Sequence, residues 1–401
     1  MYYNKEMKYI YIVILITLAF FSCKESSQGL KCESVITCNL DSIHRIEYLS
    51  EICDSVSLIK IDGEEKNLIG QVEKILCDDS LYYILSVNKL FVIEPSGKVR
   101  HMVNRRGHAN DEYIELNDFS IAGNRLILSD TQLKRLIVLD KNCNYIETHS
   151  VDVYPEFINL MDEQIVAISC SGDNGSRLVF YDMQKQKIIR NYFDYEKRFS
   201  LSMPNVFSST TQDNLYWQPG SNNIYKLFLD GGLFCKYYID FGKYNFDENN
   251  LRQKEFMGQR FLVDEKGSAR LLNVISNHKT LCIELDCEQK SEDAVYIVFI
   301  NHDNGEKMII DSDRFDDDLL FYDYRLVPDF STSKGFDFVG VIYPSLWKHC
   351  IENINERNPR FNYVREYVNN IADTQNPIIC IYHMKDGSDY AVSANSINHN
   401  K

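Results

Sequence analysis

The sequence lacks any concentrated positive charge. Among its 401 residues, 58 Asp and Glu outnumber 43 Lys and Arg, so the formal net charge is −15 and the pI is about 5.1. Lys and Arg stand at most two together, as in Arg105-Arg106. Because nucleic-acid binding requires a basic face that neutralises phosphates, this composition excludes nucleic acid as a partner. An acidic surface instead keeps a secreted protein soluble.

The sequence also lacks the linear motifs of common enzymes. It contains no Gly-x-Ser-x-Gly, no P-loop and no Gly-x-Gly-x-x-Gly. Its nine histidines are scattered without a His-x-x-x-His or His-Glu-x-x-His pair. We therefore assign no catalytic residue, no metal ligand and no cofactor.

No hydrophobic run is long enough for an ordinary membrane-spanning helix. The longest, Tyr9 to Phe21, is well short of the roughly 20 residues that such a helix needs. Lys5 and Lys8 precede it and the polar stretch "KESSQG" follows Cys23. This is the layout of a secretory signal peptide, which we place at residues 1–22.

The ending "AFFSC" resembles a bacterial lipobox, with Phe20 in place of the usual Leu. The resemblance implies that Cys23 carries acyl chains, which hold a protein at a bilayer by burying methylenes. Residues 23–40 would then form the lipidated tether. Lys24 is not the Asp that retains enteric lipoproteins in the inner membrane, so an outer-membrane address is favoured, in the periplasmic or the cell-surface leaflet. The alternative is a secreted protein that is cut nearby.

The twelve cysteines form no Cys-x-x-Cys pair. If Cys23 is lipidated, eleven remain, and several lie inside apolar strand-like runs, as Cys282 and Cys380 do. A thiol in such a run behaves as a small buried hydrophobe. Cys32 with Cys38 is the pair that the sequence most favours for a disulfide.

A repeat runs through the middle of the chain. An apolar strand, an acid and a turn recur in "LFVIEPSGK", "LIVLDKNCN", "LVFYDMQKQ" and "YKLFLDGGL", and a second strand precedes each. The acids are Glu94, Asp140, Asp182 and Asp230, separated by 46, 42 and 48 residues. A period in the forties is the length of one four-stranded propeller blade. "LYWQPGSNNIYKLFLDGG" is also similar to a YWTD-type blade segment.

Two more blades complete the predicted ring, which makes an all-β, six-bladed β-propeller of four-stranded antiparallel blades over residues 41–390. "TLCIEL" and "VYIVFINHDNGEKMII" form the fifth blade, after an insertion at 243–269 with helix-compatible apolar spacing. "RLVPDF", "FDFVGVIYP" and "NPIICIYHMK" form the sixth, which an N-terminal strand near "RIEYLS" or "SVSLIKID" completes and so hides the edges. Residues 344–375 show two helical faces and are predicted as a helical insert, and 391–401 as a C-terminal tail.

These features together resemble the six-bladed β-propeller lipoproteins of Bacteroides and its relatives. The resemblance is carried by the lipobox, by "LIGQVEKILCDDSLYYIL", "LFVIEPSGKV" and "NPIICIYHMK", and by a connector that in the family reads Gly-Gln-Gly-Pro-Gly-Glu-Tyr. Gly107, Glu112 and Tyr113 match this connector, while Ala109, Asn110 and Asp111 replace Gly, Pro and Gly. The family implies a fold and a cell-envelope location, and no catalytic residues.

The polar connector "NRRGHANDEY" is the first candidate site. Its members are Arg105, Arg106, Gly107, His108, Asp111, Glu112 and Tyr113. His108 with the two acids would suit acid–base work or a ligand, whereas a connector between blades must also be polar and Glu112-Tyr113 suits a structural cap. The structural interpretation is favoured.

Two further groups are candidates. "DSDRFDDD" offers oxygens of the kind calcium prefers, but without the Gly and distal Glu of an EF-hand loop it is predicted as a solvated turn. Tyr216, Trp217 and Trp347 either present rings to a sugar or peptide or pack between neighbouring sheets.

The sequence thus predicts a monomeric, non-catalytic lipoprotein that binds a glycan, peptide or envelope protein. One alternative is a propeller lyase or hydrolase whose site gathers residues from several blades at the channel mouth. Another is a scaffold that docks through the insert at 344–375.

Overall fold

The computed structural model describes the chain from Cys32 to Lys385 with gaps. The described ranges are 32–44, 46–63, 67–78, 80–171, 176–194, 206–210, 213–218, 221–245, 251–256, 259–264, 268–288, 293–312, 316–322, 330–331, 337–354, 359–372 and 375–385. The predicted signal peptide, Cys23 and the tail at 391–401 lie outside them.

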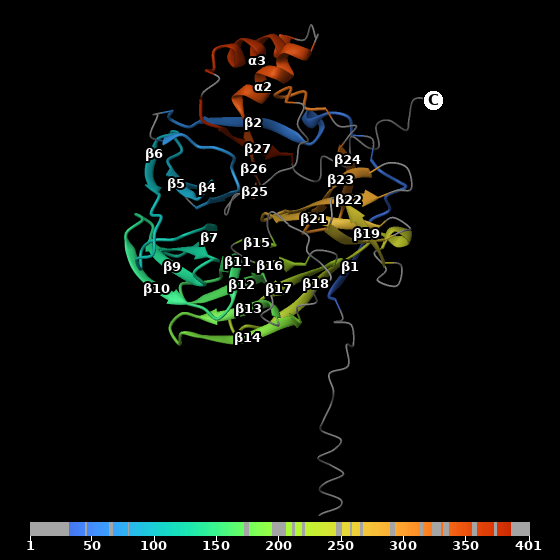
Figure 1. Ribbon diagram of the computed structural model, residues 1–401. Coiled ribbons are helices and arrows are strands. Elements are labelled where there is room, and N and C mark those ends of the chain that lie inside the picture. The colour runs from blue at the N-terminus through green and yellow to red at the C-terminus, as the bar shows by residue number, and fades with distance from the viewer. Residues whose placement is uncertain are drawn as a thin grey trace, which may run out of the picture.

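Six antiparallel sheets of the described residues form a ring, which is the predicted six-bladed propeller (Figure 1). The first strands of successive blades contact one another and so line the centre of the ring. Blade 1 contains β3 (Lys74–Cys77), β4 (Tyr82–Ser86), β5 (Lys89–Ile93) and β6 (Val99–Val103). Blade 2 contains β7 (Leu116–Ala122), β8 (Arg125–Asp130), β9 (Arg135–Asp140) and β10 (Tyr145–Ser150). Blade 3 contains β11 (Tyr154–Leu160), β12 (Ile165–Ser171), β13 (Ser176–Asp182) and β14 (Lys187–Asp194).

The other half of the ring follows the same order. Blade 4 contains β15 (Phe207–Ser209), β16 (Asn214–Trp217), β17 (Asn223–Leu227) and β18 (Leu233–Asp240). Blade 5 contains β21 (Ala269–Ser276), β22 (Thr280–Glu288), β23 (Asp293–Asn301) and β24 (Lys307–Asp311). Blade 6 contains β25 (Phe330–Ser331), β26 (Phe338–Ile342), β27 (Ile378–Met384) and β2 (Cys53–Lys60).

The ring closes as predicted, because the N-terminal β2 supplies the outer strand of blade 6. β2 pairs antiparallel with β27, with Val56 opposite Tyr382 and Leu58 opposite Cys380. Of the two candidate closing segments, the structure uses "SVSLIKID". The other, which follows Arg45, leads into the 3₁₀ turn η1 (Leu49–Glu51).

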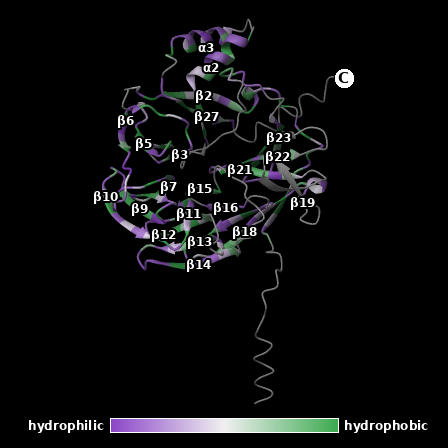
Figure 2. Cartoon of the chain, viewed as in Figure 1, coloured by the Kyte–Doolittle hydropathy of each residue, from purple (hydrophilic) through white to green (hydrophobic). Residues whose placement is uncertain are grey.

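Burial falls from the middle to the outer edge of blade 2, whereas the outer strand of blade 5 is itself buried at Met308, Ile309 and Ile310. In blade 2, residues 135–139 of β9 are all buried, whereas Tyr145 and Ile146 of the outer β10 are exposed. Figure 2 shows hydrophobic and hydrophilic residues interleaved within the blades. The hydrophobic core therefore consists of side chains packed between neighbouring sheets, as the period-two alternation of strands requires.

The N-terminal segment adds a fifth strand to blade 4. β1 (Ser34–Thr37) pairs parallel with β18, with Ser34 opposite Tyr237. This strand lies in the range 23–40 that we assigned to the tether, so strand structure starts before residue 41. The chain then crosses blade 5, where the His44 N–H donates to the Ile309 carbonyl over 2.9 Å.

Cys32 forms a disulfide with Cys235 of β18, so the predicted pairing with Cys38 is wrong. The two Cα atoms of the bridge are 4.6 Å apart. Since β1 is extended at about 3.3 Å per residue, Cys38 is carried far beyond bonding distance of Cys32. Cys38 is one of nine buried thiols among the described residues, the others being Cys53, Cys77, Cys143, Cys170, Cys282, Cys287, Cys350 and Cys380.

The insertion between blades 4 and 5 is a β-hairpin and not the predicted helix. After the 3₁₀ turn η3 (Gly242–Tyr244), β19 (Leu251–Phe256) pairs antiparallel with β20 (Gln259–Asp264). The register runs without a break from Leu251 opposite Asp264 to Phe256 opposite Gln259. Cross-strand pairing therefore satisfies the backbone of both segments and overrides the apolar spacing that suggested a helix.

The helical insert is confirmed between β26 and β27. It consists of α2 (Pro344–Asn353), with Pro at its first position, and α3 (Pro359–Asn369). Phe361, Val364 and Val368 of α3 are buried in one cluster with Phe338 of β26, so the insert is part of the core of blade 6. Neither α2 nor α3, nor any other helix of the described residues, has the length and apolar character that crossing a membrane requires.

Candidate functional site

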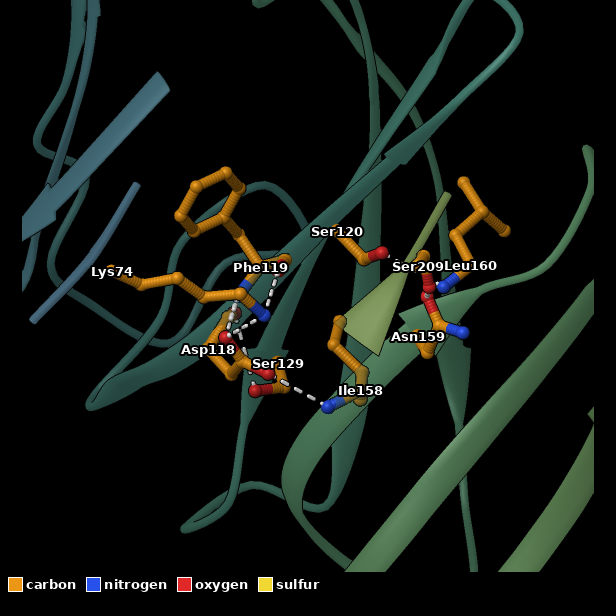
Figure 3. Close-up of polar contacts among 9 residues, drawn as sticks. All are labelled: Lys74, Asp118, Phe119, Ser120, Ser129, Ile158, Asn159, Leu160 and Ser209. Carbon is orange, nitrogen blue, oxygen red and sulfur yellow. Dashed lines mark hydrogen bonds and ion pairs between the residues drawn. The ribbon is translucent and has the colours of Figure 1, made fainter. Parts of the chain in front are cut away.

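The inner strands carry buried polar side chains that join one blade to the next. The Lys74 ammonium on β3 lies 2.7 Å from the Asp118 carboxylate on β7, and it also donates to the Phe119 carbonyl at 2.9 Å. The Asp118 carboxylate further accepts the N–H of Phe119 and that of Ile158 on β11, each at 2.8 Å. Asp118 thus connects three successive blades (Figure 3).

The environment of Asp118 has two opposing effects on its ionisation. Burial raises the pKa of the Asp118 carboxyl, while the Lys74 ammonium and the two N–H donors favour the charged form. Each carboxylate oxygen of Asp118 already accepts a hydrogen bond from another group of the protein. The pair is therefore suited to bracing the ring and not to transferring a proton to a substrate.

The bracing continues around the ring. The Leu160 N–H of β11 donates to the Ser120 hydroxyl of β7 at 2.8 Å, and the Ser209 hydroxyl of β15 donates to Asn159 of β11 at 2.8 Å (Figure 3). The next junction is made by the Ser276 N–H of β21, which donates to the Ser208 hydroxyl at 2.9 Å. Buried polar groups need such partners because an unpaired one costs about 1–3 kcal/mol.

The candidate connector between β6 and β7 is folded around Tyr113. The Tyr113 ring is buried, and its hydroxyl donates to the carbonyl of Asn88 at 2.8 Å, with the Val103 carbonyl at 3.2 Å. Its backbone N–H donates to the Arg105 carbonyl at 2.9 Å, and its carbonyl accepts the Gly107 N–H at 3.0 Å. Tyr113 therefore fastens this connector to the turn between β4 and β5.

The charged members of the connector make local structural contacts. The Glu112 carboxylate accepts the Ala109 N–H at 2.9 Å, and a Cβ on Gly107 would lie 2.0 Å from that carboxylate, which explains the glycine. The Arg105 guanidinium donates to the Cys143 carbonyl at 3.0 Å and lies 3.6 Å from Asp111. Arg106 and His108 are exposed. The structure brings these residues together as a connector, and a ligand role for them stays a prediction.

Of the two alternatives for Tyr216, Trp217 and Trp347, the structure shows packing between sheets, because all three rings are buried. Trp217 and Trp347 are 0% exposed and Tyr216 is 2% exposed. Tyr216 packs against Phe207 with ring centroids 5.3 Å apart, and the Trp347 indole N–H donates to the Leu320 carbonyl at 2.8 Å. These rings fill the spaces between sheets and under the helical insert, so they are not available for stacking on a ligand.

The described part of the acidic stretch, residues 311–312 and 316–318, is a turn held by its own carboxylates. The Asp317 carboxylate accepts the N–H groups of Leu319 and Leu320 at 3.0 and 2.8 Å. Asp318 accepts the backbone N–H and the hydroxyl of Ser50 at 2.8 and 2.6 Å. Among the described residues, no group of three or more His, Cys, Asp or Glu side chains is placed to hold a metal ion.

A cavity that the sequence did not indicate lies where the N-terminal segment crosses blade 5. It has a volume of about 300 Å³ and is lined by Ile43, His44, Ile46, Glu47, Tyr48, Asp311 and Asp316. The size is at the lower end of the range for small-molecule sites. No sequence signal could have found it, because the lining residues come together only through the crossing.

Hydrogen bonds fix the walls of this cavity. The Ile309 N–H donates to His44 Nδ1 at 3.2 Å, so the other ring nitrogen is the one that carries the hydrogen of a neutral imidazole. The Asp316 N–H donates to the Glu47 carbonyl at 2.8 Å, and the Leu49 N–H donates to the Asp316 carbonyl at 2.9 Å. Glu47 and Asp316 are both exposed residues. The cavity thus combines apolar walls with an acidic rim.

Comparison with known proteins places the chain in a family. The profile described as "Domain of unknown function (DUF4934)" matches residues 36–383. No curated protein matches the sequence significantly. A crystal structure of a Bacteroides fragilis protein that is named as exported superposes with a TM-score of 0.64 at 13% identity, covering 88% of this chain and all 100% of its own. At that identity the likeness concerns the fold alone.

Two other solved structures are less similar. A DUF4221 member from Bacteroides vulgatus has a TM-score of 0.45 at 9% identity, covering 82% of this chain and 98% of its own. An inactive virginiamycin B lyase from Staphylococcus aureus has a TM-score of 0.37 at 11% identity, covering 64% of this chain and 88% of its own. Neither similarity is high enough to support a functional argument.

Proposed function

Because the chain belongs to the DUF4934 family and folds as a six-bladed propeller, we propose that it is a non-catalytic, lipid-anchored binding protein of the cell envelope. The observation that carries the binding role is the cavity with apolar walls and an acidic rim. The non-catalytic part of the proposal is supported by Lys74 and Asp118, the buried titratable pair at the centre of the ring, whose hydrogen bonds join three blades.

The chemistry of the cavity indicates which class of ligand it would bind. Glu47 and Asp316 present carboxylates, which accept hydrogen bonds from sugar hydroxyls and pair with basic side chains. Ile43, Ile46 and Tyr48 offer apolar contact beside them. A short peptide with a Lys or Arg next to an apolar residue fits both features, and a neutral glycan fits the carboxylates alone.

A thermal-shift screen of the purified protein against basic peptides, acidic peptides and glycans tests the binding role. A ligand at about 100 times its Kd adds roughly 2.7 kcal/mol of stability. We expect basic peptides to raise the melting temperature and Glu47→Gln to reduce that rise. Asp303→Asn is the matched control, since it removes one exposed carboxylate of blade 5 outside the cavity lining. Equal loss of binding in both variants, or no shift with any ligand, contradicts the proposal.

The anchoring and location are proposed on separate grounds. The lipobox resemblance points to Cys23, and the structurally similar Bacteroides fragilis protein is named as exported. The Cys32–Cys235 disulfide fits an oxidising compartment outside the cytoplasm. We place the protein at the outer membrane, in either leaflet. Cys23→Ala is expected to move it from the membrane fraction to the soluble fraction, and a variant that stays with the membranes would falsify the anchor.

A further inference from the structure

The turn between β17 and β18 exposes two adjacent apolar side chains. Phe228 is 42% exposed and Leu229 is 50% exposed. The turn itself is ordered, because the Phe228 N–H donates to the Gly232 carbonyl and the Gly231 N–H to the Phe228 carbonyl, each at 3.0 Å. Gly231 has a φ of +82°, which favours glycine. The two side chains are therefore held outward by a defined turn.

This turn rests on the outer strand of blade 3. The Tyr192 hydroxyl donates to the Gly231 carbonyl at 2.8 Å, and a Cβ on Gly231 would lie 2.7 Å from Cγ of Arg190. On the same strand Ile188 is 37% exposed. The exposed cations Lys185, Lys187 and Arg190 belong to β14 and the turn before it. We call this set the blade 3–4 tip, and its members are Lys185, Lys187, Ile188, Arg190, Phe228 and Leu229.

The N-terminal chain enters the fold from the side of this tip. β1 runs parallel to β18, and Cys32 is joined to Cys235 near the start of β18. The Glu33 N–H donates to the Cys235 carbonyl at 2.9 Å. Since β18 starts directly after the turn that carries Phe228 and Leu229, Cys32, the first described residue, lies toward the end of β18 where that turn is.

The distance to the anchor is limited by covalent geometry. Nine residues lead from Cys23 to Cys32, and at about 3.5 Å per residue they span at most roughly 30 Å. The disulfide prevents this end from peeling away from blade 4. A lipid at Cys23 therefore keeps this side of the ring close to the bilayer. Figure 1 shows α2 and α3 at the opposite edge of the ring from β14 and β18.

Resting on the proposed lipid anchor, we infer that the blade 3–4 tip contacts the membrane surface and fixes the orientation of the propeller. Apolar side chains beside cations are the composition of interfacial membrane contacts. The tip has three cations against the two carboxylates of Asp182 and Asp230, in a chain whose net charge is −15. Phe228 and Leu229 would enter the headgroup region, while the helical insert would face away from the bilayer.

A fluorescence experiment on the lipidated full-length protein tests this orientation. The native Trp217 and Trp347 are both buried and give a constant background. Leu229→Trp places a reporter at the tip, and Tyr363→Trp places one on α3, where Tyr363 is 72% exposed. Each variant is reconstituted into vesicles of phosphatidylethanolamine and phosphatidylglycerol, with and without brominated acyl chains that quench indole at the membrane interface.

We expect brominated lipid to quench the Leu229→Trp reporter about twofold more than the Tyr363→Trp reporter. Because both reporters are tryptophans, the preference of indole for interfaces is the same in both and only orientation separates them. Equal quenching, in protein that still sediments with the vesicles, overturns the oriented contact and leaves the anchor intact. If wild type and Cys23→Ala both fail to sediment, the anchor itself is wrong and the inference falls with it.

Discussion

Lys74 Nζ lies 2.7 Å from Oδ1 of Asp118, and the two side chains come from the inner strands of neighbouring blades. The Lys74 and Asp118 side chains are only 10% and 2% exposed. The carboxylate extends the connection to a third blade through the Ile158 N–H. One buried ion pair thus helps to set the spacing of three sheets around the channel.

We predict that Lys74→Met destabilises the protein by about 3–5 kcal/mol, because it leaves the Asp118 carboxylate buried without its cation. Urea denaturation measures the loss. Lys185→Met is the matched control, since Lys185 also pairs with an aspartate but its side chain is 61% exposed, and it should cost less than about 1 kcal/mol.

A double variant separates the ion pair from simple packing. Lys74→Met with Asp118→Leu removes both charges, so it should be more stable than Lys74→Met alone. Additive losses would show that the two side chains act independently, which would contradict the bracing role.

Tyr113→Phe should cost about 1–2 kcal/mol, because it removes the hydroxyl that donates to the carbonyls of Asn88 and Val103. His108→Ala should change stability by less than about 0.5 kcal/mol, since His108 is exposed on the same connector. Thermal unfolding of both variants checks the structural interpretation of "NRRGHANDEY". If His108→Ala instead lowers binding of a ligand found in the screen, the connector has a functional role as well.

Stability should depend on the ionisation of Asp317. Burial raises the pKa of its carboxyl to about 6 from an ordinary value of 3.8, although the N–H groups of Leu320 and Leu319 oppose the rise. Between these two pH values the unfolded chain releases the proton and the folded protein keeps it. This group therefore lowers the free energy of unfolding as pH rises through that window, by about 1–3 kcal/mol in total.

The test of this prediction is a comparison of unfolding free energies for Asp317→Asn and wild type across the window. The free energy of unfolding of Asp317→Asn should increase relative to that of wild type as pH rises from about 4 to about 7. Asp213→Asn should show the opposite sign at pH values below the ordinary carboxyl pKa of 3.8 and a constant difference above it, because Lys226 and Lys236 lower the pKa of Asp213 despite its burial. Parallel pH profiles for Asp317→Asn and wild type would show that the native carboxyl titrates normally.

The blade repeat was predictable because blades 2, 3 and 4 use the same local chemistry at the turn between their third and fourth strands. Asp140 accepts the Asn142 N–H at 2.8 Å, Asp182 accepts that of Lys185 at 2.8 Å, and Asp230 accepts that of Gly232 at 2.8 Å. In these three blades the acid that marked the period in the sequence is thus the cap of the turn between the third and fourth strands. Local chemistry of this kind is fully visible in a sequence.

Features that depend on the crossing N-terminal segment were not predictable. The Cys32–Cys235 bridge spans 203 residues and follows from the parallel pairing of β1 with β18. The cavity depends on the same segment meeting β24 and the turn after it. The sequence around Trp217 and Trp347 does not show whether their rings are exposed or packed in the core. Their burial depends on the residues that surround them in the fold.

The pairing of β2 with β27 has a consequence for how the protein is made. After β1, β2 is the first blade strand to be synthesised and β27 is the last, so the outer strand of blade 6 has no neighbour until nearly all of the described chain is complete. An unpaired strand edge can join other chains, and slow non-local pairing prolongs that exposure. Cys32 likewise cannot form its disulfide until Cys235 has been synthesised. The ring can therefore close only after β27 has been made, and the edge of β2 stays unpaired through almost the whole synthesis of the described chain.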